Sequence, residues 1–342
     1  MKRIAIEEHV WIEDLKALRE TRYDYTKMET AENADNKVER NATSLDRKSS
    51  TPPEMLTKLI DVEDIRLKDM DQHGIDMQVL SSTVNLAPYG SDGITAARQV
   101  NNAIAKLTKK YPQRFAGFAT ISPSDPIAAA MELERGVKEL GLKGTMITSS
   151  ISAGEYWDNQ KYWIIFEKVE ELGVPVYIHP TFVSPDMVKA FLPYSQMFGS
   201  VWGFAADTGL AAMRLICSGI FDKYPGLKII LGHLGEALPF WLWRIDSRWE
   251  KERVSQNPLA KKLGRKPGQY INENFYVTTS GMLYQPALQC TISALGVDKV
   301  MFAVDYPFEP SNEAVEFMDR LQINDTDKEK IYHLNAEELL KL

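Results

Sequence analysis

Four side chains with metal-ligand chemistry stand at the ends of apolar segments that lie far apart in the sequence. His9, His179 and His233 each end a short apolar run, and Asp305 ends a fourth. Imidazole and carboxylate groups are common ligands of divalent transition metals. Metal-binding residues repeated at the carboxyl ends of strands are typical of a (β/α)8-barrel metalloenzyme, whose site is assembled at that end of the barrel.

Glu7 is a further candidate ligand, because it would share a strand face with His9. Successive side chains of a strand alternate between two faces, so Glu7 and His9 point together and Glu8 points away. A carboxylate and an imidazole that project into a barrel mouth can chelate one divalent ion. The alternative is an ion pair at the barrel rim.

His179 and Asp305 each have a structural alternative. A single histidine at a strand end is often a satisfied core residue, and an aspartate there can cap a loop. Pro180 follows His179 and stops its strand, while an apolar strand leads directly into Asp305. Because both residues belong to a set at strand ends, we expect His179 to bind metal or substrate and Asp305 to bind metal or move a proton.

His233 and Glu236 form a pair suited to proton transfer. They lie three residues apart, so the carboxylate can orient the imidazole or raise its basicity. Gly232 and Gly235 permit a tight turn and a close backbone approach. Glu236 can also stabilise a helix N-terminus, and the two roles are compatible.

The charge of these groups favours a single metal ion. Glu7, His9, His179 and Asp305 carry two negative charges together when both histidines are neutral, so one divalent cation neutralises them. A second metal would need a bridging group such as a carbamylated lysine at the end of the fourth strand, but Lys143 stands at the beginning of that strand. We predict one divalent ion, Zn or Mn.

Eight apolar segments that alternate with helical patterns would have to position these residues. Most of the apolar segments are continuous runs, which is typical of parallel strands buried on both faces. Eight repeats of strand and helix predict the α/β class and a single (β/α)8 barrel over residues 1–342. The predicted strands are 4–10, 77–83, 115–121, 144–148, 174–180, 228–233, 275–280 and 300–305, and the predicted helices are 55–72, 94–111, 126–140, 159–172, 205–222, 236–252, 284–295 and 311–321.

Residues 20–54 interrupt this pattern after the first strand. The segment is polar, charged and poorly periodic, and it falls in the first strand-to-helix connection, on the active-site face of a barrel. It is either a lid or subunit-contact arm, or a solvated insertion.

Composition excludes several classes of protein. The chain of 342 residues is 44% apolar, which suffices for a large core, and none of its apolar runs is long enough to cross a membrane. A net charge of −7 without a basic face argues against nucleic-acid binding. Cys217 and Cys290 lie in apolar helical contexts, so we expect two buried thiols, no disulfide and a cytoplasmic location.

One arginine and several aromatic residues could contact a substrate. Arg244 lies two turns along the predicted helix 236–252, where a guanidinium could clamp a carboxylate; the alternative is a salt bridge, for example with Asp246. Four aromatic residues could form a wall of the site or could simply belong to the core: Trp241, Trp243, Tyr306 and Phe308.

Taken together, these motifs resemble the amidohydrolase superfamily. The similarity is strongest to its non-oxidative aromatic acid decarboxylases, which act on γ-resorcylate, 2,3-dihydroxybenzoate and 5-carboxyvanillate and are related to aminocarboxymuconate semialdehyde decarboxylase. The segments that carry the resemblance are Ile6-Glu7-Glu8-His9, Tyr177-Ile178-His179-Pro180, Gly232 to Pro239 and Asp305-Tyr306-Pro307-Phe308.

The resemblance implies a role for each residue. Glu7, His9, His179 and Asp305 would hold one metal ion, and His233 with Glu236 would form the catalytic pair. Arg244 and Thr83 fall where such enzymes contact substrate, as His179 also would.

The reaction implied is decarboxylation of an ortho-hydroxy aromatic acid. Asp305 would protonate the ring carbon that bears the carboxylate, and carbon dioxide would then leave without a redox cofactor. The resemblance also implies a homodimer or homotetramer, in which a helix around 194–204 could supply contacts, although this helix could equally belong to the core. The alternatives are a hydrolase of a lactone, amide or ester with Asp305 as base, and a barrel that only binds a small aromatic ligand.

Overall fold

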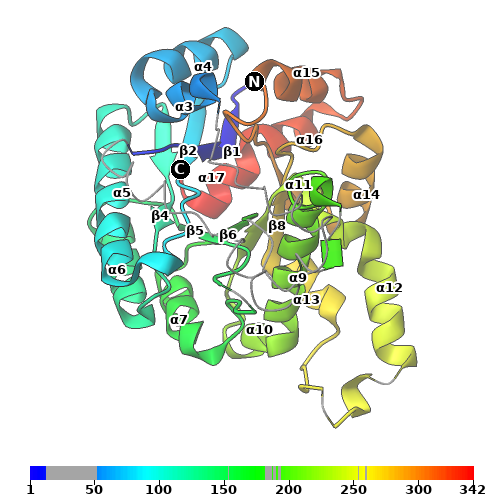
Figure 1. Cartoon of the computed structure of the whole chain (residues 1–342). Helices are drawn as coiled ribbons and strands as arrows, with labels where there is room; N and C mark the ends of the chain where they lie inside the picture. The colour runs from blue at the N-terminus through cyan, green and yellow to red at the C-terminus, as the bar shows by residue number, and fades with distance from the viewer. Residues whose placement is uncertain are drawn as a thin grey trace, which may run out of the picture.

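The computed structural model describes residues 1–12, 52–152, 154–181, 187, 190–191, 194–252, 254–258 and 260–342. Within them, short parallel strands form the centre of the molecule and helices surround it (Figure 1). The strands are β1 (Ile4–His9), β2 (Met77–Ser81), β3 (Phe115–Gly117), β4 (Ala119–Thr120), β5 (Thr145–Thr148), β6 (Val176–His179), β7 (Ile229–Leu231), β8 (Phe275–Thr278) and β9 (Val300–Met301).

The strands pair in sequence order and close into a barrel. β1 pairs with β2 and β2 with β3, while β4 to β9 pair consecutively, every pair being parallel. β3 and β4 are two parts of the third barrel strand, separated at Phe118. The ring closes between β1 and the segment after β9, where Glu8 bridges Tyr306 and the His9 amide donates to the Tyr306 carbonyl at 2.7 Å. The predicted (β/α)8 barrel is confirmed.

Helices follow the strands as the sequence pattern predicts, with several breaks. Arg244 lies on α12, which begins at Leu238 rather than at 236. The helical segments are α3 (Pro53–Ile60), α4 (Leu67–His73), α5 (Gly90–Lys110), α6 (Pro126–Lys138), α7 (Trp163–Leu172), α9 (Gly203–Ser218), α10 (Ile220–Lys223), α11 (His233–Glu236), α12 (Leu238–Lys251), α13 (Pro267–Asn274), α14 (Gln285–Leu295), α15 (Ser311–Arg320), α16 (Asp325–Glu329) and α17 (Asn335–Leu340).

Three predicted helices are wrong in detail, and one of them, predicted over 205–222, is divided at Gly219 into α9 and α10. The helix expected over 55–72 is divided, because the Asp61 side chain accepts hydrogen bonds from the amides of Asp64 and Ile65 and starts a new π-helical turn, Val62–Arg66. The helix expected around 194–204 is a 3-10 turn, Ser195–Met197, followed by the start of α9 at Gly203.

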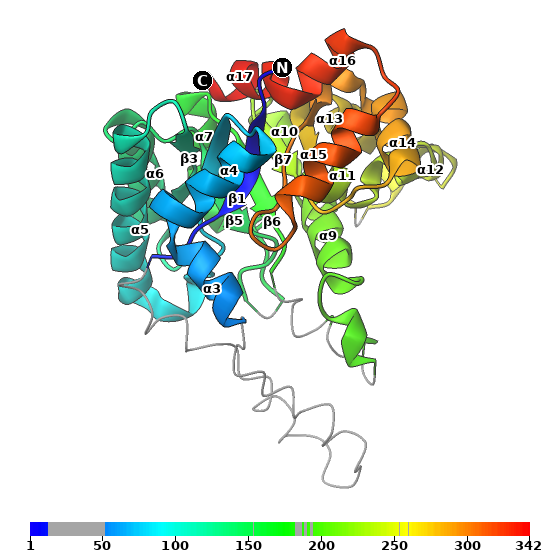
Figure 2. The same ribbon diagram turned by 90° about the horizontal axis from the view of Figure 1, so that it is seen from above.

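The apolar core has two layers. One layer fills the barrel interior and includes Ile4, Phe118 and Tyr177; the other lies between the barrel and the outer helices. Ala336 and Leu340 of α17 belong to the interior layer, so α17 closes the amino-terminal mouth of the barrel. Both chain ends lie beside α17 at that end (Figure 2), which leaves the carboxyl ends of the strands available for a site.

Three further expectations can be placed against the structure. Of the insertion predicted at 20–54, residues 20–51 lie outside the described residues, and α3 begins at Pro53. Both thiols are free, but Cys217 is exposed and Cys290 half-buried, so their predicted burial is wrong. No helix in the described ranges combines the length and apolar character that crossing a bilayer requires.

Gly117, at the end of β3, is expected to be intolerant of a larger side chain. An alanine Cβ there would lie 2.3 Å from Cγ2 of Ile104 on α5 and 3.2 Å from Cδ2 of Leu142. The Gly117→Ala variant should therefore lose about 1–3 kcal/mol of unfolding free energy through overpacking. Urea denaturation measures this loss. Gly199→Ala is the control, because its Cβ would have no neighbour within 4 Å, and an equal loss in both variants would contradict the prediction.

Candidate active site

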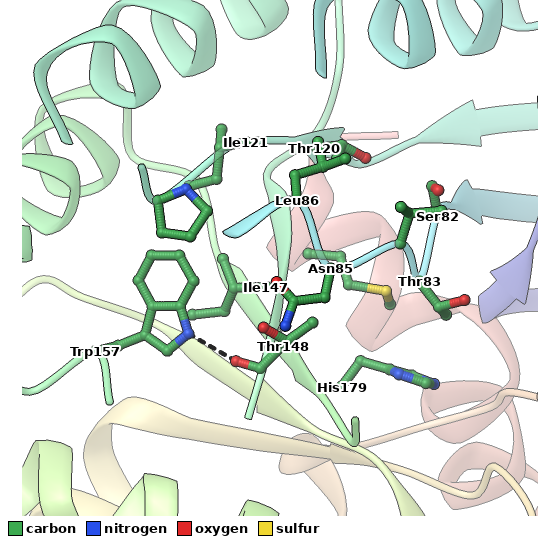
Figure 3. A pocket seen from close by; sticks show the side chains of 13 residues that line it. Ser82, Thr83, Asn85, Leu86, Thr120, Ile121, Ile147, Thr148, Trp157 and His179 are labelled. Carbon is green, nitrogen blue, oxygen red and sulfur yellow. Dashed lines mark hydrogen bonds between the residues drawn. The ribbon is translucent and has the colours of Figure 1, made fainter. Parts of the chain in front are cut away.

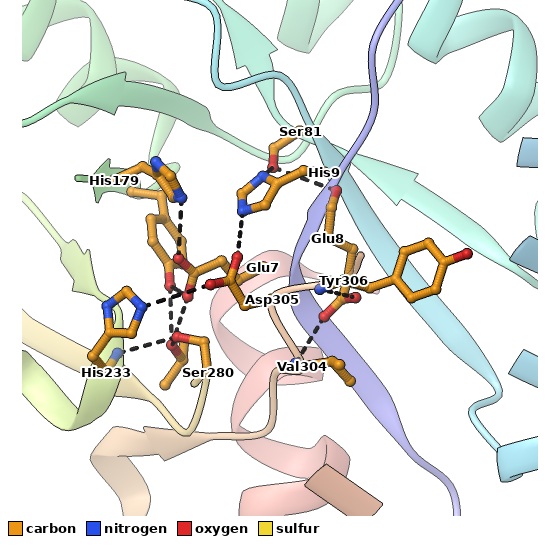
Figure 4. Close-up of polar contacts among 12 residues, drawn as sticks. Glu7, Glu8, His9, Ser81, His179, His233, Ser280, Val304, Asp305 and Tyr306 are labelled. Carbon is orange, nitrogen blue, oxygen red and sulfur yellow. Dashed lines mark hydrogen bonds and ion pairs between the residues drawn. The ribbon is translucent and has the colours of Figure 1, made fainter. Parts of the chain in front are cut away.

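The residues predicted to bind metal meet at the carboxyl ends of their strands. Glu7, His9, His179 and Asp305 are buried, and each offers a ligand atom that lies within 4.8 Å of the other three (Figure 4). They come from β1, from β6 and from the segment after β9. The parallel barrel therefore unites groups that are up to 298 residues apart in the chain, 305 − 7, as predicted.

The two carboxylate oxygens of Glu7 have different surroundings. Oε2 accepts hydrogen bonds from the hydroxyls of Tyr177 and of Thr278, the latter at 3.2 Å. Oε1 is buried without a hydrogen-bond partner among the described residues and lies 3.6 Å from Nε2 of His179. Burial raises the pKa of Glu7, because a buried carboxylate loses the hydration that stabilises its charge.

His9 and His179 present their rings to each other at 4.5 Å between centroids. His9 contacts Ser81 Oγ through Nδ1 at 3.1 Å and Asp305 Oδ1 through Nε2 at 2.9 Å. Burial, together with the nearby charge of His9, lowers the pKa of His179 to about 3. His179 is therefore neutral at ordinary pH, the state in which imidazole binds a metal.

These observations test whether a divalent cation fits the four residues. Two carboxyl groups and two imidazoles converge, Glu7 Oε1 is buried and unsatisfied, and His179 is neutral. A cation at their centre would satisfy Glu7 Oε1 and neutralise the buried carboxylates. The donor set therefore fits one divalent ion.

His233 lies beside this cluster in an unusual turn. His233, Leu234, Gly235, Glu236 and Ala237 all have positive φ, so the segment that Figure 1 labels α11 is left-handed rather than α-helical. Left-handed conformations are costly for residues other than glycine, and such strain is concentrated at functional sites. The turn aims the His233 ring at Asp305, whose Oδ2 is 3.7 Å from Nε2.

The predicted His233–Glu236 pair is formed. Nδ1 of His233 lies 2.8 Å from Oε1 of Glu236. Burial alone would lower the pKa of His233, but the charge of Glu236, the nearby Asp305 carboxylate and the hydrogen bond with Glu236 outweigh it and raise this pKa well above its usual range. His233 therefore holds a proton at neutral pH.

Asp305 lies beside both the other metal ligands and the His233–Glu236 pair. Burial would raise its pKa, but the nearby His233 and the hydrogen bond with His9 outweigh burial and hold the pKa of this carboxyl below its usual range. Asp305 is anionic and His233 is protonated. The protonated ring therefore stands beside the Asp305 carboxylate, with Nε2 of His233 3.7 Å from Oδ2, and the same carboxylate belongs to the cluster of metal ligands.

A pocket adjoins the cluster at His179 (Figure 3). It is open to solvent, and the predicted substrate-binding residues Thr83 and His179 both line it. Arg244 is exposed on α12 and is not among the lining residues. The other residues of the lining are Ser82, Val84, Asn85, Leu86, Thr120, Ile121, Pro123, Met146, Ile147, Thr148 and Trp157.

The aromatic wall predicted from the sequence is mostly absent from this site. Trp243 is 74% exposed and Trp241 47% exposed on α12, while the buried Tyr306 ring points away from the metal ligands (Figure 4). Phe308 alone fits the prediction, with its ring centroid 5.6 Å from that of His9.

Several polar residues at the site were not found by sequence reasoning. Tyr177 and Thr278 point into the barrel beneath Glu7, and their alternation with apolar neighbours on β6 and β8 was the available signal. Glu309 lies at the mouth, where it and His233 flank Gly281. Burial, together with the charges of Asp305 and Glu313, raises the pKa of Glu309.

Comparison with known proteins agrees with this geometry. The chain is 39% identical over 298 residues to a γ-resorcylate decarboxylase of a Polaromonas species. This match covers 85% of this chain and 90% of that protein. The structure of the present chain resembles that of 5-carboxyvanillate decarboxylase from Sphingomonas paucimobilis, with a TM-score of 0.87 and 35% identity. The match covers 100% of this chain and 99% of that one.

A second solved structure has metal in place. It is a dihydroxybenzoic acid decarboxylase from a Polaromonas species with bound manganese and the inhibitor 2-nitroresorcinol, with a TM-score of 0.84, 34% identity and coverage of 100% and 97%. The profile of the amidohydrolase family matches residues 60–342. From the barrel, the convergent ligands and these similarities, the chain belongs to the amidohydrolase family.

Proposed function

We propose that this protein is a metal-dependent carboxy-lyase that removes carbon dioxide non-oxidatively from a phenolic acid with a hydroxyl ortho to the carboxylate. The observation that carries the proposal is the position of Asp305, which stands between the metal ligands and the protonated His233. The γ-resorcylate and 5-carboxyvanillate decarboxylases that the chain resembles act on acids of this kind.

In the proposed assignment, Glu7, His9, His179 and Asp305 hold one divalent ion. When bound, this ion supplies Lewis-acid chemistry to the carboxylate and ortho oxygens of the substrate. Asp305, His233 and Glu236 are the catalytic residues. Manganese is supported by the bound ion of the Polaromonas enzyme, and the donor set also suits zinc.

The residues of the chain then move one proton. The proton held by His233 passes through Asp305 to the ring carbon that bears the carboxylate, which interrupts the aromatic system. The bond between this carbon and the carboxylate carbon breaks, its electron pair returns to the ring, and carbon dioxide leaves. Glu236 stabilises the protonated His233 before transfer, and solvent returns a proton to His233 afterwards.

The pocket beside His179 is the proposed site for the ring. Met146, Ile147 and Trp157 offer apolar surface, while Thr83 and Asn85 offer polar groups at one side. Substrate contact by Thr83 and His179 is supported by their place in this lining. Contact by Arg244 stays a prediction, since its exposed side chain lies outside the lining.

We also propose that the protein is a homodimer or homotetramer. Large apolar side chains are exposed on α12 and on the segment before α9, as is typical of surfaces that bind another protein chain. Free thiols agree with a cytoplasmic protein. Light scattering of the purified protein measures the assembly. The exposed residues are Val201, Trp202, Phe240, Trp241 and Trp243.

The test of function is carbon dioxide release from a panel of 2-hydroxybenzoates by the manganese-loaded protein. Lactones, esters and amides form the second panel, because the same ligands could support hydrolysis with Asp305 as base. Carbon dioxide release with the hydroxybenzoates alone supports the lyase. Hydrolysis without release of carbon dioxide would show that the protein is a hydrolase. Failure to bind any metal would favour a barrel that only binds a small aromatic ligand.

Glu236→Gln separates catalysis from metal binding. The amide keeps the shape of the side chain but removes the charge that holds the proton on His233, so kcat should fall by about 10²- to 10³-fold. Metal content should stay near that of the wild type, because Glu236 is not among the four convergent ligands. Elemental analysis and kcat measured on one preparation test this, and loss of the metal would mean that Glu236 is a ligand.

A further inference from the structure

Where β1 meets the segment after β9, a side chain helps the backbone to hold the barrel closed. The only strand bridge there among the described residues joins Glu8 to Tyr306. The Glu8 side chain supplies further bonds: Oε1 accepts from the Val304 amide at 2.9 Å and Oε2 from the Tyr306 amide at 3.3 Å (Figure 4). Glu8 therefore binds the two amides on either side of Asp305.

Asp305 needs such support because its backbone is in the left-handed region. Its φ is +77°, a conformation that is costly for a residue with a Cβ atom. Its own amide donates to the Glu7 carbonyl at 3.1 Å. With the two bonds to Glu8, three consecutive amides, 304 to 306, are fixed to β1, and this fixes the direction in which the Asp305 carboxylate points.

Arg66 supports the same junction from behind. It is fully buried on the turn Val62–Arg66, and its guanidinium lies 4.4 Å from the centre of the Tyr306 ring. One terminal nitrogen donates to the His9 carbonyl and the other to Gln78 Oε1 at 2.9 Å. Arg66 is thus bound to the backbone of a second candidate metal ligand, and its positive charge partly offsets the burial that raises the pKa of Glu8.

We propose that Glu8 and Arg66 are positioning residues of the metal centre: Glu8 fixes Asp305 through the two amides beside it, and Arg66 fixes His9 and the Tyr306 segment. The inference rests on the metal-dependent reaction proposed above. Neither residue touches the substrate or the reacting atoms. The competing explanation is that the pair only stabilises the barrel, in which case its loss would lower stability and leave the metal centre unchanged.

Glu8→Gln is the informative variant. A carboxyl group offers two acceptor oxygens to the two amides whether or not it is protonated, whereas an amide offers one oxygen and turns an N–H toward the other donor. One of the two bonds beside Asp305 is therefore lost while size and shape are kept. Glu132→Gln is the matched control, because Glu132 is also buried and accepts hydrogen bonds, from Asn101 and Arg135, but is not a member of the metal cluster.

Manganese affinity, measured by titration and electron paramagnetic resonance, is the main readout. For Glu8→Gln we expect the dissociation constant to rise about 10- to 100-fold, as for other residues that orient metal ligands. The metal-saturated enzyme should show lower kcat with little change in KM, and the amides of residues 304–306 should exchange hydrogen faster. Glu132→Gln should lower the unfolding temperature without any of these changes.

A double-mutant cycle with Asp305→Ala isolates the route of the effect. If Glu8 acts through Asp305, adding Glu8→Gln to Asp305→Ala should weaken manganese binding no further. An equal loss of affinity in both backgrounds, or unchanged affinity in Glu8→Gln, would overturn the proposal. Should the wild type bind manganese but release no carbon dioxide, the proposed reaction fails, and the affinity cycle still decides the positioning role.

Arg66 is tested by a conservative pair. Arg66→Met leaves the buried His9 carbonyl and Gln78 Oε1 without their donor, so this variant is expected to unfold readily. Arg66→Lys keeps the charge but cannot donate to His9 and Gln78 in the same geometry. We expect Arg66→Lys to fold and to bind manganese about 10-fold more weakly, and wild-type affinity in this variant would remove Arg66 from the proposal.

Discussion

Replacing Asp305 by Asn is expected to lower kcat for decarboxylation by at least about 1,000-fold. An amide cannot relay the proton that His233 holds, and it is a poorer ligand beside His9. Asn keeps the size of the side chain and tolerates positive φ, so the backbone at +77° should persist. Steady-state release of carbon dioxide by manganese-saturated protein measures the effect.

The control for Asp305→Asn is its metal content and its unfolding temperature. A folded variant that holds manganese but does not turn over would assign proton transfer to Asp305, while one that loses both would assign metal binding. Activity within a few-fold of the wild type would show that Asp305 is neither the proton relay nor an essential ligand.

Removing the metal with a chelator is expected to have an effect of similar size. The apoprotein should lose turnover, because the substrate oxygens would meet two carboxylates without a cation. It should also unfold at a lower temperature, since an ion at 100 times its dissociation constant stabilises the native state by about 2.7 kcal/mol. Carbon dioxide release and thermal unfolding before and after chelation test both effects.

Added manganese should restore both turnover and unfolding temperature. Glu236→Gln serves as the matched control, because it should lose and regain the stabilising ion as the wild type does while its turnover stays low. Full turnover by protein with no measurable metal would contradict the assignment of the four ligands.

The parts of the site that stand on strands could be predicted from the sequence. Glu7, His9 and His179 end apolar runs, and parallel strands of a barrel bring their carboxyl ends to one rim. His233 and Glu236 are close in sequence, so their hydrogen bond needed only a local turn. The alternation of strand side chains also separated Glu8 from its two neighbours on β1.

Other expectations failed because they depended on which side of an element faces inward. Trp241 and Trp243 lie on α12, whose sequence does not reveal which of its faces a barrel covers. The helix predicted over 55–72 is divided for a different reason, because one side chain, Asp61, caps a new turn. Cys217 lies in an apolar segment, yet it is exposed on the outer face of α9.

The sequence by itself determined the barrel, the identity of the candidate ligands and the end of the strands at which they meet, because the period of apolar residues and the rule for parallel strands are local or general. The tertiary structure alone decided the left-handed turn at His233, the unpaired oxygen of Glu7 and the support of Asp305 by Glu8 and Arg66. These features arise from burial and from contacts between residues hundreds of positions apart, and neither is a property of any short stretch of sequence.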